Sequence, residues 1–215
     1  CKCSCSSIII KYTLFINNQF SKTIADEYSS KVFSHLAMTI SDKNGRILVV
    51  GEASYDILKH ILEHRPLEVD YVEYDRNLSG LIRDHIKGLV IESPLINIIN
   101  DDARRFIQGL SNQYDIIILD IPEPENLQLN RFFTVEFFES AKRGLKRDGI
   151  LIFSLSSIAS QASFSKMDLV ASIYNAAKTI FSNVIPLAYD KIYFFSSDTS
   201  LNIDFDELIN KYRGY

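Results

Sequence analysis

The sequence predicts an α/β fold: a doubly wound, mainly parallel sheet preceded by a small N-terminal β-hairpin extension. Three observations carry this prediction. From residue 46 onward, short runs rich in Ile and Val alternate with longer segments of helical periodicity. The short runs are apolar throughout, which is typical of strands buried on both faces. The chain has 215 residues, 47% of them hydrophobic, so it can bury one large core and a small appendage.

Residues 1–44 precede the alternating region and differ from it. The stretch IIIKYTLFINNQFSKTIADEY predicts two strands that turn at Asn17–Asn18. We therefore expect an N-terminal β-rich extension, residues 1–44, attached to an α/β domain, residues 45–215. All three cysteines lie in the opening CKCSC, and their alternate spacing without a nearby histidine favours reduced thiols over a metal clip.

Within the α/β domain, strands and helices are expected to alternate. The predicted strands are RILVV (46–50), VDYVEY (69–74), INIIN (96–100), DIIILD (115–120), GILIFSL (149–155) and KIYFFSS (191–197). The predicted helices are DILKHILEHR (56–65), NLSGLIRDHIKG (77–88), ARRFIQGL (103–110), TVEFFESAKRGL (134–145) and KMDLVASIYNAAKTIF (166–181). Thr134 is the expected N-cap of the fourth of these helices.

Polar residues follow four of the predicted strands. They are Gly51 and Glu52, Glu73 and Asp75, Asp101 and Asp102, and Asp120 and Glu123. One acid at a strand end is commonplace, because Asp suits turns and helix N-caps. In doubly wound sheets, however, ligands bind across the carboxyl ends of the strands where strand order reverses. The repetition therefore predicts a ligand site there, with Glu73 placed to accept both ribose hydroxyls of a nucleoside. Asp102 could accept a hydrogen bond from an adenine amino group or simply cap a helix.

Several of these segments resemble the polyamine aminopropyltransferases, the spermidine synthases. The matching stretches are NNQFSKTIADEY, VEYDR, NDDARRFI, YDIIILDIPEP and QLNRFFTVEFFESAKRGLKRDGILIFSL. The resemblance covers roughly residues 12 to 155 in the family's order, and the DxPxP segment followed by LNRFFT and EFF is its most specific part. VEYD and LKRDG also occur in other Rossmann-like methyltransferases, so the resemblance implies a Rossmann-like, methyltransferase-type fold.

The resemblance also implies a role for each acid. Glu73 would bind the ribose of decarboxylated S-adenosylmethionine, and Asp102 with Ala103 would contact its adenine. Asp120 would act as the base, and Glu123 would hold the diamine. A protonated amine has to lose a proton before it attacks the carbon next to the sulfonium, and a carboxylate can orient the cation and accept that proton. Such a displacement requires no metal.

The loop after the first predicted strand departs from the family. Family members carry a glycine-rich loop of the Gly-Gly-Gly-Asp-Gly type, whereas this chain has GEASYD and keeps only Gly51 for the donor. Side chains at Glu52, Ala53 and Tyr55 would crowd the donor's path. Ser54 stands where the family has the aspartate that helps hold the aminopropyl amine.

Three functions therefore stay open. The first is aminopropyl transfer from decarboxylated S-adenosylmethionine to a di- or polyamine. The second is methyl transfer from intact S-adenosylmethionine, although Glu52 would repel the carboxylate of that donor. The third is a non-catalytic protein that has lost the donor loop. SSKV at residues 29–32 also departs from the family, since Lys31 would repel a diamine.

The histidines of the sequence are candidates for a metal site. The motif HILEH, residues 60–64, carries two histidines four apart on a helix, as in inverted zinc proteases. His60 and His64 lie opposite the apolar stripe of that helix, so we expect them to face solvent and expect no metal. His35 and His85 are isolated in the sequence and are expected to be structural.

Charge and hydropathy limit the partners. The net charge of −4, without a dense basic stretch, speaks against nucleic acid and is compatible with a cationic small molecule. No apolar run reaches the ~20 residues of a membrane span, so the sequence predicts a soluble, cytoplasmic chain. The chain opens with Cys1 rather than Met, which leaves open a preceding segment with a membrane anchor. The family resemblance implies a homo-oligomer formed through the N-terminal β extension.

Overall fold

The structure is a computed structural model and describes most, but not all, of the chain. The described residues are 12–16, 19–24, 27–41, 44–73, 80, 82, 93–156 and 164–201. Asp75, His85 and the three cysteines lie outside this part, as does most of the helix predicted over residues 77–88.

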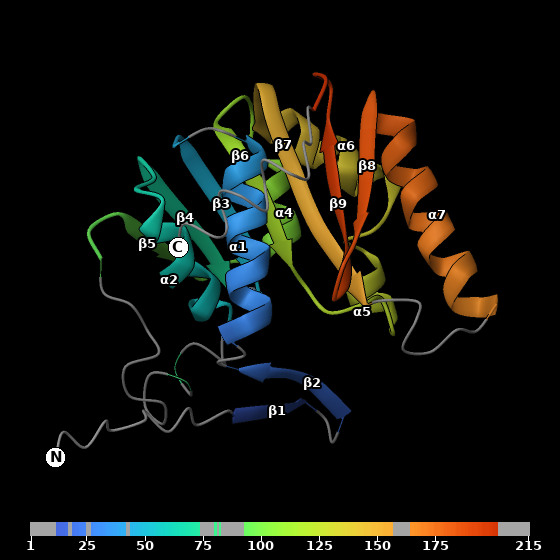
Figure 1. Cartoon of the computed structure of the whole chain (residues 1–215), viewed down its shortest axis with the longest axis horizontal. Coiled ribbons are helices and arrows are strands. Elements are labelled where there is room, and N and C mark those ends of the chain that lie inside the picture. The colour runs from blue at the N-terminus through green and yellow to red at the C-terminus, as the bar shows by residue number, and fades with distance from the viewer. Residues whose placement is uncertain are drawn as a thin grey trace, which may run out of the picture.

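Seven strands of the described chain form one sheet in the spatial order β5-β4-β3-β6-β7-β9-β8 (Figure 1). They are β3 Arg46–Gly51, β4 Glu68–Glu73, β5 Ile96–Ile99, β6 Tyr114–Asp120, β7 Leu145–Ser156, β8 Asn183–Ala188 and β9 Lys191–Ser197. The strands from β5 to β7 are parallel, and β9 is antiparallel to both of its neighbours. The chain leaves β3 toward β4 and β5 on one side and later returns to β6 and β7 on the other, so strand order reverses between β3 and β6.

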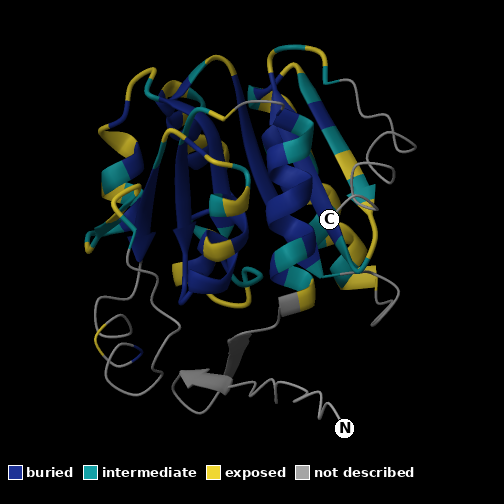
Figure 2. Cartoon of the chain, turned by 60° about the vertical axis from the view of Figure 1, so that its left-hand side comes forward, coloured by how far each residue is buried: buried dark blue, intermediate teal, exposed yellow. Residues whose placement is uncertain are grey.

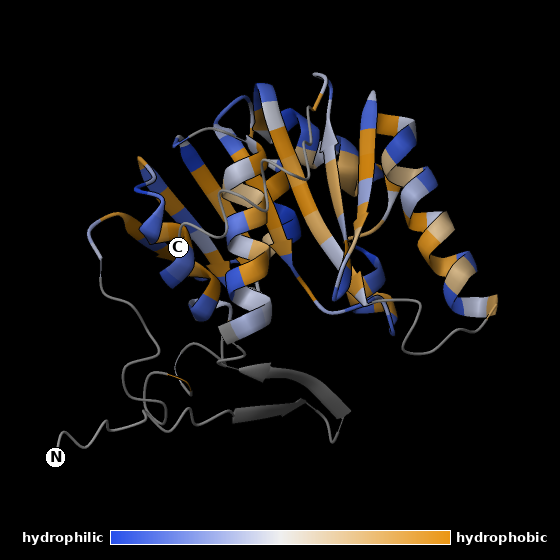
Figure 3. Ribbon diagram, viewed as in Figure 1, coloured by the Kyte–Doolittle hydropathy of each residue, from blue (hydrophilic) through white to orange (hydrophobic). Residues whose placement is uncertain are grey.

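Helices cover both faces of this sheet. They are α1 Glu27–Ser41, α2 Tyr55–Glu63, α4 Ala103–Gln108, α5 Leu127–Asn130, α6 Val135–Gly144 and α7 Phe164–Ile180. Side chains alternate along each strand, so Leu48 and Val50 of β3 pack in the core with α4, α6 and α7, whereas Ile47 and Val49 pack with α1 and α2. Figure 1 shows α1 in front of the sheet and α4 behind it. The strands are almost entirely buried (Figure 2) and largely apolar (Figure 3), as expected for a sheet sandwiched between helices.

The doubly wound, mainly parallel sheet predicted from the sequence is confirmed, as are its six predicted strands. Thr134 is the N-cap of α6, since its side chain accepts a hydrogen bond from the backbone N–H of Phe137 at 3.3 Å. The prediction missed β8, an edge strand that carries Pro186 and is only partly buried. Proline within an apolar run argues against a strand, but an edge position tolerates it because one side of the strand has no ladder partner.

The N-terminal segment contains the predicted hairpin and also a helix that was not predicted. Strands β1 Tyr12–Ile16 and β2 Gln19–Ile24 pair antiparallel, and they lie apart from the seven-stranded sheet (Figure 1). Residues 27–41 are not β structure: they form α1, whose Val32, Phe33 and Leu36 are buried in the same core as α2. Their spacing along the chain is helical, and α1 packs against α2.

Among the described residues, no helix combines the length and the apolar character that crossing a bilayer demands.

Candidate functional site

Three of the predicted site residues end neighbouring strands in register. Gly51 of β3 pairs with Glu73 of β4 on one side and with Asp120 of β6 on the other. They therefore stand side by side at the carboxyl edge of the sheet. This is also where strand order reverses, the place where doubly wound folds bind their ligands.

Gly51 allows the chain to fold back tightly after β3. A Cβ atom at this position would lie 2.1 Å from Oγ of Ser54 and 3.1 Å from the carbonyl oxygen of Asp120. Only glycine fits such a close approach. The turn brings residues 52–54 over the strand ends, and α2 begins immediately afterwards at Tyr55.

The side chain of Glu73 is fully buried and held by this loop. Its Oε2 accepts a hydrogen bond from the backbone N–H of Ala53 at 2.9 Å and another from the hydroxyl of Tyr71 at 2.7 Å. The hydroxyl oxygen of Tyr71 in turn accepts from the backbone N–H of Ser54 at 3.1 Å. Burial, together with the adjacent Glu73 carboxylate, raises the pKa of Tyr71 well above its usual value, so the hydroxyl stays a donor.

Asp120 is held by a side chain of the same loop. The hydroxyl of Ser54 donates to Oδ2 of Asp120 at 2.5 Å. Ser54 therefore supplies a neutral donor to this carboxylate. Tyr55 is buried, and its ring meets that of Tyr71 edge-on at 5.3 Å. Glu52 is also fully buried. The loop therefore touches both the acid predicted for the ribose and the acid predicted as the base.

Glu123 lies three residues beyond β6 and reaches toward β7. Its Oε1 accepts a hydrogen bond from the backbone N–H of Ser156, the last residue of β7, at 2.5 Å. The ammonium group of Lys166, from the first turn of α7, lies 3.7 Å from Oε2. At about 4.8 Å per strand, β4 and β7 are about 14 Å apart, so Glu73 and Glu123 mark the two ends of an extended acidic edge.

Asp102 and Ala103 lie beyond the end of β5, the next strand outward. Asp102 is the N-cap of α4: its Oδ1 accepts from the backbone N–H of Arg105 at 2.9 Å, and its Oδ2 accepts from the Arg131 guanidinium at 2.9 Å. Burial opposes the charged form of Asp102, but the hydrogen bonds from Arg105 and Arg131 outweigh it and lower the pKa of the carboxyl. Ala103 is buried in the core. The structure thus shows the capping role of Asp102 that the sequence left open.

Some site residues were missed by sequence reasoning. Tyr71 lies two residues before Glu73 on one strand, and residues two apart share a face of a sheet, so alternation could have indicated it. Arg131 belongs to the LNRFFT motif and could have been tested as a partner for an acid. No local pattern indicated Lys166 or the contact of Ser54 with Asp120, because both depend on how distant segments pack.

A second cluster of titratable groups lies away from this edge, between α1 and α2. The prediction that His60 faces solvent is wrong: His60 is 3% exposed and His35 is 2% exposed. The reason is α1, which covers the side of α2 that a lone helix would turn to solvent. His35 is not isolated either, since its ring lies 4.8 Å from that of His64 and 5.8 Å from that of His60, centroid to centroid.

Comparison with known proteins gives one family. The model described as "Spermine/spermidine synthase domain" matches residues 26–207. A polyamine aminopropyltransferase of Korarchaeum cryptofilum is 26% identical over 144 residues, which make up 65% of this chain and 44% of that protein. The chain also spans less than two thirds of two other polyamine aminopropyltransferases: 32% of the length of the protein from Leptospira interrogans and 60% of the length of the protein from Methanocaldococcus jannaschii.

Solved structures give the same fold. A spermidine synthase in complex with the transition-state analogue AdoDATO superposes with a TM-score of 0.76 at 16% identity, over 93% of this chain and 76% of that one. Human methyltransferase-like protein 13, solved with SAH, gives a TM-score of 0.66 at 17% identity, over 86% of this chain and 89% of that one. These identities show the fold alone. The Rossmann-like, methyltransferase-type fold is therefore confirmed.

Proposed function

The chain belongs to the spermine/spermidine synthase domain family, and from that premise we propose that it transfers an aminopropyl group from decarboxylated S-adenosylmethionine to a di- or polyamine. One observation carries the proposal. Glu73 and Asp120 flank Gly51 in register where the strand order of the sheet reverses. An acid suited to a ribose therefore lies on the strand at one side of β3, and an acid suited to an amine lies on the strand at the other side.

The donor half of the proposed site centres on Glu73. The bonds from Ala53 and Tyr71 fix the direction of its carboxylate before any ligand arrives. Ribose hydroxyls would share this carboxylate with those two donors. Decarboxylated S-adenosylmethionine fits the charges better than the intact form, because the loop of residues 51–54 contains no cation to meet the carboxylate of an intact donor.

The acceptor half centres on Asp120 and Glu123. Asp120 would take the proton that the attacking amine must lose, and holding both reactants across the ends of β4, β3 and β6 would supply the orientation that a displacement needs. Glu123 would hold the distal ammonium group of a diamine. That ammonium would compete with Lys166, which already lies 3.7 Å from the carboxylate.

A second candidate is a non-catalytic member of the family. The observation that favours it is that the chain's own groups engage both acids of the acceptor half: the Ser54 hydroxyl contacts Asp120, and Lys166 pairs with Glu123. A protein of this kind would keep the nucleoside half of the site and lack turnover. Methyl transfer has only the shared fold in its favour.

Calorimetry with three ligands separates these functions. The purified chain is titrated with 5′-methylthioadenosine, decarboxylated S-adenosylmethionine and intact S-adenosylmethionine, and Glu73→Gln serves as the matched variant. Aminopropyl transfer predicts that the decarboxylated donor binds more tightly than the intact one. It also predicts that the decarboxylated donor and 5′-methylthioadenosine bind more weakly to the Glu73→Gln variant than to the parent chain. Tighter binding of the intact donor would point to methylation, and binding of none of the three would refute a nucleoside site. Donor binding without product in the presence of putrescine or spermidine would favour the non-catalytic candidate.

A further inference from the structure

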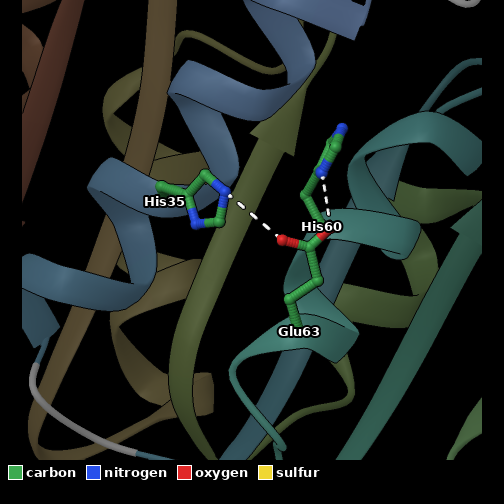
Figure 4. A group of neighbouring side chains, drawn as sticks. All are labelled: His35, His60 and Glu63. Carbon is green, nitrogen blue, oxygen red and sulfur yellow. Dashed lines mark hydrogen bonds and ion pairs between the residues drawn. The ribbon is translucent and has the colours of Figure 1, made fainter. Parts of the chain in front are cut away.

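A cluster of histidines and one glutamate joins α1 to α2, away from the carboxyl edge of the sheet. His35 comes from α1, His60 and Glu63 come from α2, and His64 caps the end of α2. Figure 4 shows the ring of His35 pointing across to the carboxylate of Glu63, which His60 approaches from within α2. The pattern HILEH thus acquires a third histidine from another helix.

We propose that His35, His60 and Glu63 form a binding site for a divalent transition metal ion of the zinc class. The ligand atoms that these residues offer lie within 4.8 Å of one another. Two ligands of a tetrahedral zinc ion, each about 2.0–2.1 Å from the metal, lie about 3.3–3.4 Å apart. Here Nδ1 of His60 is 3.0 Å from Oε1 of Glu63, and Nε2 of His35 is 3.6 Å from Oε2. These two distances, which run to the two oxygens of one carboxylate, lie on either side of the expected ligand separation, and the side chains would have to move closer wherever a separation approaches the upper limit of 4.8 Å.

The donor set determines the class of metal. Two imidazole nitrogens and one carboxylate oxygen suit Zn²⁺, Co²⁺ or Ni²⁺, whereas Mg²⁺ and Ca²⁺ prefer oxygen ligands alone. An imidazole has to be neutral to coordinate a metal. His35 and His60 each present a ring nitrogen toward the carboxylate of Glu63.

His64 supports the cluster as a positioning residue. Its Nε2 lies 2.5 Å from Nδ1 of His35, so the two rings share one hydrogen. Metal-binding histidines almost always use their second ring nitrogen in such a contact, which fixes the tautomer and the ring orientation. With a hydrogen on Nδ1 of His35, its Nε2 would present a lone pair toward Glu63 and the proposed ion.

Burial and access also fit a metal site. His35 and His60 are almost completely buried, whereas the side chain of Glu63 is 41% exposed and leaves a path from solvent. Without a metal, a hydrogen on Nδ1 of His60 bridges to Glu63. On binding, the ion would take that place while the hydrogen moves to the other ring nitrogen, and the three protein ligands would leave a fourth position for water.

The proposed ion would reinforce an existing polar contact between the two helices. Ser34 of α1 donates to the carbonyl oxygen of Ile57 in α2 at 3.1 Å, and Ser30 donates to Asp56. Because α2 begins directly after the loop that holds Glu73 and Asp120, a metal clip would stabilise the helix pair behind that loop. The inference does not depend on the proposed aminopropyl transfer.

Zinc titration of the full chain tests the site. Cys1, Cys3 and Cys5 are first replaced by serine so that thiolates cannot bind the metal, and the protein is stripped with a chelator. We expect calorimetry to show that one equivalent of Zn²⁺ binds, and we expect the bound ion to raise the melting temperature. Co²⁺ should replace Zn²⁺ and give the visible absorption bands of a four-coordinate ion without a thiolate charge-transfer band. Glu63→Gln should raise the Kd at least about tenfold, and His64→Ala by about 10–100-fold.

The matched control is Glu139→Gln, which alters an exposed glutamate on α6 and should leave the Kd unchanged. Melting curves without metal establish that each variant is folded. His35→Gln and His60→Gln should abolish binding, and if either fails to fold, the partly exposed Glu63 decides the question. Absence of zinc binding, or binding that Glu63→Gln leaves unchanged, would overturn the proposal.

Discussion

The two halves of the carboxyl edge hold their acids in different ways. On the β4 side, Glu73 is fully buried and bound by a backbone N–H and by a tyrosine whose position the core fixes. On the β6 side, Asp120 and Glu123 are half-buried and contacted by the side chains of Ser54 and Lys166. The carboxylates of Asp120 and Glu123 are partly exposed, so a ligand can reach them more easily than it can reach the fully buried carboxylate of Glu73. The comparison indicates a pre-organised donor half and an acceptor half that its substrate has to open.

The largest expected effect is on the acceptor half. Asp120→Asn keeps the size of the side chain but removes the base, so turnover should fall by about 10²–10⁴-fold, the range typical of general base catalysis. Steady-state kinetics with decarboxylated S-adenosylmethionine and putrescine measure it. The donor Kd and the melting temperature should stay within error of the parent chain. Unchanged turnover would remove Asp120 from the chemistry and contradict the division of labour between the halves.

The next effect concerns stability and compares the two halves directly. Tyr71→Phe removes a donor from the fully buried Glu73 and should lower the free energy of unfolding by about 1–3 kcal/mol, the cost of a buried polar group left unsatisfied. Ser54→Ala removes the donor to half-buried Asp120, where water can substitute, and should cost less. Urea unfolding monitored by circular dichroism measures both. Equal losses for the two variants would mean that the halves are equally rigid.

A smaller effect is expected from the cation of the acceptor half. Lys166→Met removes the ammonium that pairs with Glu123, so the KM for the amine should fall, by up to about tenfold, which corresponds to about 1.4 kcal/mol. The donor Kd should not change, because Lys166 lies at the far end of the edge. If the amine KM rises instead, Lys166 helps to bind the amine, and the acceptor half is not blocked by its own cation.

The smallest effect concerns Asp102. Its pKa is lowered in the folded chain, so its contribution to stability is present above the unfolded value of about 3.9 and is lost as the pH falls through the lower folded value. Arg131→Gln removes one of the groups that lower this pKa. It should cost no more than about 1 kcal/mol at pH 7, as for other exposed ion pairs, and should weaken the loss of stability below about pH 4. Unfolding curves at pH 3 and pH 7 measure the difference, with Arg104→Gln as the control.

The sequence predicted most of the sheet because buried parallel strands leave an unmistakable pattern of apolar runs. It placed Gly51, Glu73 and Asp120 at strand ends for a related reason, since a strand end can be recognised locally. It failed where packing between distant segments decides the outcome. Burial of His60 depends on α1, a helix that was not predicted because residues 1–44 were interpreted as a β-rich extension. Strand β8 was missed because Pro186 lies within it. The contacts of Ser54 and Lys166 carry no local signal at all.

The loop after β3 contains a second residue, Ala53, whose backbone conformation favours glycine. Ala53 has a φ of 52°, in the left-handed region where a residue with a side chain is disfavoured by roughly 1–2 kcal/mol. Glycine would remove that penalty but would also enlarge the unfolded ensemble by about 0.4–1 kcal/mol, so the net stabilisation from glycine is at most about 1.6 kcal/mol. Position 53 therefore accepts either alanine or glycine, whereas position 51 accepts only glycine. Sterics therefore require glycine in this loop at residue 51 and leave it optional at residue 53.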